Sequence, residues 1–140
     1  MIILDTNVVS ETFKEDPDSH VAQWLKKQQP SSLRLCSITV AELLYGLRLM
    51  PEGRKKRDLS ILITRTLLKY NGRTLSFDAA SANNYAAIAS QRKRAGHNVS
   101  IFDTQIAGIA AANHCSIATR NTKDFEDSGL DIINPWEYEG

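Results

Sequence analysis

The sequence contains few of the residues that build disulfide frameworks or zinc sites. Two of its 140 residues are cysteine and three are histidine, and Cys36 and Cys115 stand far apart without a CxxC motif or a Cys/His ladder. This spacing argues against a structural zinc site and favours a reduced, cytoplasmic chain. The seven glycines form neither a P-loop nor a GxGxxG fingerprint, so a nucleotide cofactor is not indicated.

Long apolar runs are missing as well. No segment approaches the roughly 18 apolar residues in a row that a membrane-spanning helix needs. The first residues, Met1 to Asp5, turn acidic too soon for a signal peptide. With 42% hydrophobic and 24% charged residues, the composition is that of an ordinary soluble protein. We therefore expect one domain, residues 1–140, without a membrane segment.

The net charge of +1 conceals an uneven distribution. Residues 48–102 hold eleven Lys or Arg and three acids, whereas residues 121–140 hold six acids and one lysine. A dipolar chain of this kind suits a polyanionic partner on its basic side, although Lys and Arg also coat exposed helix faces without any partner. The residues that would contact the backbone of a nucleic acid are Arg54, Lys55, Lys56, Arg57, Arg92, Lys93 and Arg94.

Strand-like and helix-like patterns alternate along the chain. Strands are expected at residues 2–4, 33–36, 73–77, 116–119 and 131–133. Helices are expected at residues 20–29, 39–49, 54–69, 78–95 and 103–113. This alternation predicts an α/β domain with a central, mostly parallel five-stranded sheet. The right-handed crossover rule places helices on both faces of that sheet.

Several carboxylates follow a predicted strand or stand near the start of a predicted helix. Asp5 ends the first strand and can simply cap whatever helix follows it. Glu42 follows Thr39 with the spacing of a capping box. Asp103 follows Ser100 with the same spacing. Taken one at a time, these acids are better explained by helix capping than by catalysis.

Taken together, the acids predict a shared site. Ligands of an open parallel sheet bind outside the carboxyl ends of the strands, and that edge would gather Asp5, Glu42 and Asp103. The segment after the fourth strand brings Asn121 and Asp124 to the same edge. Crowded carboxylates repel one another unless a cation lies among them, and an all-oxygen set suits Mg²⁺ or Mn²⁺. Such a site is what metal-assisted hydrolysis of phosphodiesters requires.

Five motifs occur in order along nearly the whole chain: ILDTNV (3–8), ITVAEL (38–43), FDTQIA (102–107), ATRNTKDF (118–125) and NPW (134–136). Each motif is weak alone, but the ordered set is specific. It resembles the PIN domain, and within that family the VapC and FitB-like toxin ribonucleases of bacterial toxin–antitoxin pairs.

The resemblance implies an endoribonuclease that depends on Mg²⁺, with Mn²⁺ as an alternative, and that cleaves RNA such as tRNA. It also implies a cognate antitoxin, a homodimer and a toxin–antitoxin hetero-oligomer. By this likeness the acidic metal positions are Asp5, Glu42 and Asp103, and the supporting polar positions are Thr6, Asn7, Thr119 and Asn121. Many relatives carry a fourth acid where this chain has Asn121. Three alternatives follow: Asn121 supplies a neutral oxygen, Asp124 takes over the fourth catalytic position, or a fourth ligand is dispensable.

Two alternatives stay open at this point. An α/β phosphatase also begins with an Asp after its first strand, but that class usually has a second Asp two residues later, where this chain has Asn7. A catalytically inactive PIN-like domain that binds RNA or a protein is favoured by one feature, Asn121. Metal binding compared with RNA cleavage separates the inactive domain from the ribonuclease.

Overall fold

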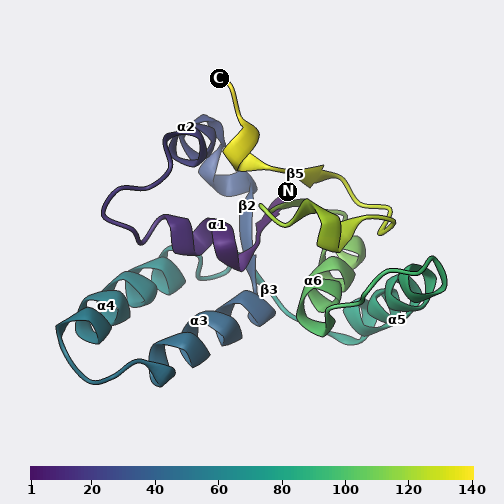
Figure 1. Ribbon diagram of the computed structural model, residues 1–140, viewed down its shortest axis with the longest axis horizontal. Coiled ribbons are helices and arrows are strands. Elements are labelled where there is room, and N and C mark those ends of the chain that lie inside the picture. Colours follow the sequence, from purple (N-terminus) through teal and green to yellow (C-terminus); the bar gives the residue numbers. More distant parts are fainter.

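A parallel sheet forms the centre of the molecule in the computed structural model, which describes all 140 residues (Figure 1). Its strands are β1 (Ile2–Leu4), β2 (Leu33–Cys36), β3 (Thr74–Leu75), β4 (Ser116–Ala118) and β5 (Ile132–Ile133). They lie in the order β3-β2-β1-β4-β5, and every neighbouring pair is parallel. The prediction of a five-stranded parallel sheet is confirmed.

Six helices cover both faces of the sheet (Figure 1). They are α1 (Thr6–Glu11), α2 (Ser19–Lys27), α3 (Ser37–Leu49), α4 (Arg54–Lys69), α5 (Ala79–Arg94) and α6 (Ile101–Ala112). Three short 3-10 turns complete the chain: η1 (Pro30–Ser32), η2 (Thr122–Phe125) and η3 (Pro135–Glu137). No helix combines the length and the apolar character that crossing a membrane requires.

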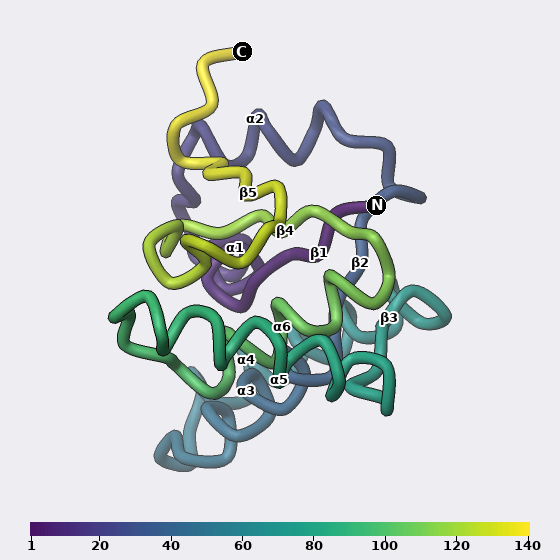
Figure 2. Tube along the Cα trace, turned by 90° about the vertical axis from the view of Figure 1, so that its right-hand side faces the viewer, coloured from purple at the N-terminus to yellow at the C-terminus, as the bar shows by residue number.

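The two faces of the sheet bury two separate cores. Side chains alternate between the faces of a strand, so Leu4 of β1 enters the core beneath α1 to α4, and Ile3 enters the core beneath α5 and α6. The tube in Figure 2 shows α5 in front of α6 on this second side. Their close approach requires Gly108, because a Cβ there would lie 2.6 Å from the carbonyl oxygen of Ser81.

The order of the strands creates a switch point beside β1. From β1 the chain builds outward through β2 and β3, and then returns to the other side of β1 as β4 and β5. Ligands of open α/β sheets bind at such a point, outside the carboxyl ends of the strands. The residues that directly follow β1 and β4 therefore face the expected site.

The boundaries of some elements differ from the prediction. Helix α1 was not expected as an element, because it is six residues long and its buried Val8 and Val9 are too few to show a helical period. Strand β3 is two residues long and pairs with β2 alone, so it is shorter than the expected 73–77. Helix α3 begins at Ser37, directly after β2, and not at Thr39.

Candidate active site

Asp5 stands at the carboxyl end of β1 and is the N-cap of α1. It is 3% exposed. One carboxylate oxygen, Oδ1, accepts the backbone N–H of Thr6 at 2.8 Å. The other, Oδ2, accepts the Thr119 hydroxyl at 2.7 Å and the Asn7 amide at 3.2 Å. Burial raises the pKa of Asp5, while these hydrogen bonds lower it and the charge of Asp124 raises it. The donors orient this carboxylate without neutralising it.

Asn7 and Thr119 join the first turn of α1 to the segment that follows β4. The Asn7 amide lies 3.3 Å from the hydroxyl of Thr119, and its Oδ1 accepts the backbone N–H of Arg120 at 3.2 Å. The Thr119 hydroxyl also accepts the backbone N–H of Asn121 at 3.0 Å. Thr119 is fully buried. These contacts hold the two chain segments together around Asp5.

Glu42 faces the same region from α3. Its Oε1 accepts the hydroxyl of Thr6 at 2.8 Å. Burial raises the pKa of Glu42, and the charge of Asp5 raises it as well. The capping-box interpretation of Thr39 and Glu42 is wrong, because the N-cap of α3 is Cys36 and Thr39 lies buried inside the helix. Glu42 therefore does not cap α3, which was the role that its spacing suggested.

Asp103 lies in the first turn of α6. Here the predicted cap is confirmed, since Ser100 is the N-cap and its hydroxyl accepts the backbone N–H of Asp103 at 3.4 Å. Burial raises the pKa of Asp103 to about 6, together with the charges of Asp5, Asp124 and, to a smaller extent, Glu42. The carboxylates of three other chain segments thus act electrostatically on Asp103.

Of the two candidates for the fourth position, Asp124 acts electrostatically on the other acids. Asp124 lies in η2, and its charge raises the pKa of both Asp5 and Asp103. The exposed Asn121 precedes η2 and makes no side-chain capping bond. Residues 120–124, all of them polar or charged, together line a depression of about 330 Å³.

The donor set fits a hard divalent cation in element and charge. Neither Asp5, Glu42, Asp103 nor Asp124 forms an ion pair with Lys or Arg, as the five ion pairs of the chain lie elsewhere. No three His, Cys, Asp or Glu side chains lie close enough to form a ready cation cage. Mg²⁺ usually keeps several waters and binds through one or two carboxylates plus substrate phosphates, so an open arrangement suits it.

The predicted basic residues fall into two groups. Arg54, Lys55 and Arg57 at the start of α4 are exposed, as are Lys93 and Arg94 at the end of α5. Lys56 is half-buried and pairs with Glu52 at 2.6 Å.

Arg92 does not fit the predicted contact with nucleic acid. It is 2% exposed, and its guanidinium donates to backbone carbonyl oxygens. Its place in a basic run suggested exposure, but it lies one turn after Ile88, which is buried in the second core.

Sequence reasoning also missed Arg120. This exposed side chain lies 5.2 Å over the ring of Trp136 and lines the same polar depression as Asp124. Its position between Thr119 and Asn121, two residues already singled out, was the available signal. The stacked guanidinium places a positive charge at the rim of the candidate site.

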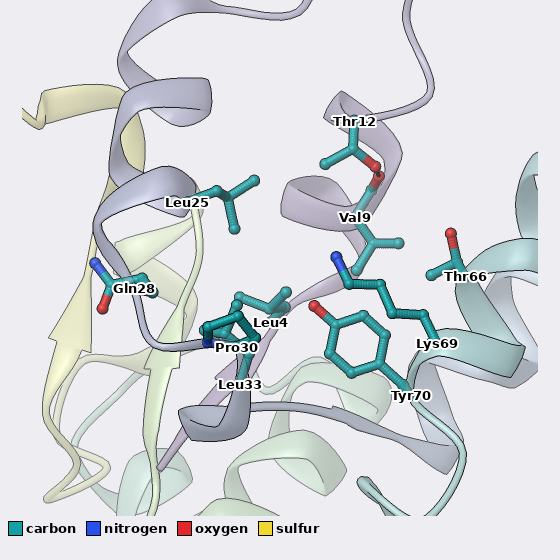
Figure 3. A pocket seen from close by; sticks show the side chains of 10 residues that line it. All are labelled: Leu4, Val9, Thr12, Leu25, Gln28, Pro30, Leu33, Thr66, Lys69 and Tyr70. Carbon is teal, nitrogen blue, oxygen red and sulfur yellow. Dashed lines mark hydrogen bonds between the residues drawn. The ribbon is translucent and has the colours of Figure 1, made fainter.

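A partly enclosed pocket of about 180 Å³ lies away from these acids, between α1, α2 and α4 (Figure 3). Its lining is largely apolar, with Leu4, Val9 and Leu25 among its walls. Lys69 and Tyr70 extend into it from the end of α4. None of the candidate carboxylates lines this pocket, so it is not part of the acidic site.

Comparison with known proteins agrees with the motifs. The PIN domain matches residues 2–129. The VapC ribonuclease Y4jK of Sinorhizobium fredii is 43% identical over 98% of this chain and 99% of its own length. The tRNA(fMet)-specific endonuclease VapC of Shigella flexneri is 33% identical over 91% of each chain. The crystal structure of FitAcB from Neisseria gonorrhoeae matches with a TM-score of 0.92 and 37% identity, covering 98% of this chain and 99% of that one.

Proposed function

Because this chain belongs to the PIN-domain family, we propose that it is a Mg²⁺-dependent endoribonuclease and the toxin of a toxin–antitoxin pair. One observation carries the proposal. Asp5, Glu42 and Asp103 follow or open elements beside the switch point of the sheet, where burial raises the pKa of each carboxyl and the charge of Asp124 adds to the effect on Asp5 and Asp103. No Lys or Arg forms an ion pair with these acids. The names of the relatives, a VapC ribonuclease and a tRNA-specific endonuclease, support the same activity.

In this proposal Asp5, Glu42 and Asp103 hold the cation, and Asp124 takes the fourth position. Bound by these carboxylates, the cation would activate a water and would stabilise the leaving oxygen of the phosphodiester. The neutral donors Thr6, Asn7 and Thr119 keep the two oxygens of Asp5 in one orientation. The Thr6 hydroxyl orients Glu42 in the same way. Mn²⁺ satisfies the same oxygen donors and should substitute for Mg²⁺.

The proposed partners follow from the charge distribution and from the relatives. RNA, with tRNA as the proposed substrate, lies with its phosphates against the exposed basic residues at the start of α4 and the end of α5. A cognate antitoxin covers the acids until it is removed, within a hetero-oligomer that contains two copies of this chain. The free cysteines Cys36 and Cys115 fit the reducing cytoplasm, where this chain would meet its substrate.

The competing candidate is a PIN domain that binds RNA without cutting it. Asn121 favours this candidate, because an amide oxygen binds a divalent cation more weakly than a carboxylate. Asp124 weakens the argument, because its charge reaches Asp5 and Asp103 and so compensates for the missing acid. The two candidates differ in a single measurement, which is cleavage in the presence of the metal.

Removal of the metal tests the proposed function. We expect the purified chain, freed of antitoxin, to cleave a tRNA transcript with Mg²⁺ or Mn²⁺, to stop when EDTA is added, and to resume when Mg²⁺ is restored. Binding of the same RNA, measured by gel shift in EDTA, should persist, because phosphate contacts do not need the metal. Undiminished binding together with intact RNA in Mg²⁺ would establish the inactive domain instead.

Neutralising the exposed basic residues tests the proposed path of the RNA. Replacing Arg54, Lys55 and Arg57 by Gln should weaken binding and flatten the plot of log K against log salt by about one unit per lost phosphate contact. Replacing Lys93 and Arg94 should act in the same way. The matched control is Lys26→Gln with Lys27→Gln, which neutralises two exposed lysines on α2. Equal salt slopes in all variants would mean that the basic residues only coat the surface.

A further inference from the structure

Arg92 is a buried charged side chain beside the turn that carries Asp124. It lies in the last turn of α5 and is 2% exposed. Its Nε donates to the carbonyl oxygen of Glu126 at 2.7 Å, and its Nη2 donates to that of Lys123 at 3.3 Å. Its Nη1 is buried and has no partner. The two accepting carbonyls lie on either side of Asp124 in the chain.

A buried arginine in this arrangement lowers the stability of the folded state. A guanidinium is always charged, and a buried charge destabilises the folded state unless it is paired and fully hydrogen-bonded. Arg92 pairs with no carboxylate, and one of its nitrogens lacks an acceptor. An apolar side chain of similar volume would remove this buried charge, but it would leave the carbonyl oxygens of Glu126 and Lys123 without their donor. What arginine adds here is a planar fork that binds two carbonyls of one turn at once.

Other contacts fasten the same turn to the same part of the chain. Phe125 of η2 is 2% exposed and packs in the core beneath α5 and α6. His97, between α5 and α6, lies 2.7 Å from the carboxylate of Asp127, just after η2. The residues from Arg92 to Asp103 thus hold η2 and also lead into the first turn of α6. The relative positions of Asp124 and Asp103 depend on this region.

We propose that Arg92 is a positioning residue for Asp124. Its two hydrogen bonds fix the backbone of η2 on both sides of Asp124, and thereby fix the carboxylate relative to Asp5 and Asp103. The inference rests on the proposed function in one respect, namely that Asp124 takes part in binding the cation. Loss of a group that orients a metal ligand typically weakens metal affinity about 10- to 100-fold.

Binding of Mn²⁺ alone, measured by titration calorimetry on the full chain without RNA, tests this role. Arg92→Met should weaken Mn²⁺ binding about 10- to 100-fold, as far as Asp124→Ala does. The double variant should lose nothing more, because Arg92 acts through Asp124. Arg92→Lys can reach one carbonyl and should keep part of the affinity. Arg65→Met, the same substitution at an exposed position of α4, should bind Mn²⁺ like the unchanged chain.

Three results would overturn the proposal: unchanged Mn²⁺ affinity in folded Arg92→Met, no effect of Asp124→Ala, or single losses that multiply in the double variant. If Arg92→Met does not fold, Arg92→Lys takes its place in the double-mutant cycle with Asp124→Ala. Unchanged Mn²⁺ affinity in Arg92→Lys would then contradict the proposal in the same way. A chain that shows the coupling but leaves RNA intact keeps the positioning role and loses the ribonuclease. A chain that cleaves RNA although the two losses multiply in the double variant keeps the ribonuclease function and loses the positioning role of Arg92.

Discussion

Replacing Asp5 by asparagine is expected to lower RNA cleavage by about a thousandfold, equivalent to about 4 kcal/mol of transition-state stabilisation. The substitution removes the most deeply buried of the four acids while keeping nearly the same shape. Asn is as good an N-cap as Asp, so its Oδ1 can still accept the backbone N–H of Thr6 and α1 should form. The change is measured as the cleavage rate at saturating Mg²⁺, beside the melting temperature.

The control for this variant is Asp78→Asn, because Asp78 is also an N-cap but lies at the start of α5, where it accepts the backbone N–H of Ser81. It should fold and cleave RNA normally. If Asp5→Asn keeps most of the activity in a folded protein, Asp5 is only a cap and the assignment of the site is wrong.

The edge of the sheet where the acids lie could be predicted from the sequence. Asp5 directly follows a strand, and Glu42 stands near the start of the helix that follows the next strand. Parallel strands present their carboxyl ends at one edge, so such junctions meet in space whatever the lengths between them. The five strands and the two-sided covering of the sheet were predictable for a related reason, since apolar runs alternate with helical patterns.

The hydrogen-bond partners of the acids could not be predicted in this way. Thr39 and Glu42 have the spacing of a local cap, yet Glu42 accepts the hydroxyl of Thr6, 36 residues away. Thr119 reaches Asp5 across 114 residues. Both contacts depend on the order of strands in the sheet, and sequence spacing does not encode that order.

Arg92 shows a different limit of prediction from sequence, which concerns the burial of a charged side chain. It begins a run of three basic residues at the end of a helix, where positive charges favour the carbonyl end of the helix dipole. That ordinary explanation covers all three equally, although only Arg92 points into the core. The distinguishing signal is its spacing of four from the buried Ile88, which places the two on one helix face.

Asp103→Asn is expected to abolish cleavage and, in the metal-free protein, to raise stability at neutral pH. Burial and the charges of Asp5 and Asp124 raise the pKa of Asp103 to about 6 in the folded state. The folded protein therefore binds the proton more tightly than the unfolded chain does, and its stability falls as pH rises from about 4 to about 6. Asparagine cannot ionise, so the variant escapes this loss.

The expected gain at pH 7 is about 1 kcal/mol, because the half-exposed carboxyl is screened by solvent and realises only part of the roughly 3 kcal/mol that the pKa implies. It corresponds to a rise of about 3 °C in Tm, measured in EDTA. The gain should disappear near pH 4, where Asp103 is protonated. Saturating Mg²⁺ should reduce or reverse it, because the cation stabilises the unchanged protein.

The matched control is Asp16→Asn, at an exposed loop position, which should leave Tm unchanged at both pH values. A destabilised Asp103→Asn protein at pH 7, or a gain in Tm that does not vary with pH, would contradict the prediction. Either result would mean that neither burial nor the neighbouring carboxylates raise the pKa of Asp103 in the metal-free protein. The crowding of acids would then no longer argue for a cation at this edge of the sheet, and the remaining support would be the likeness to ribonucleases of the PIN-domain family.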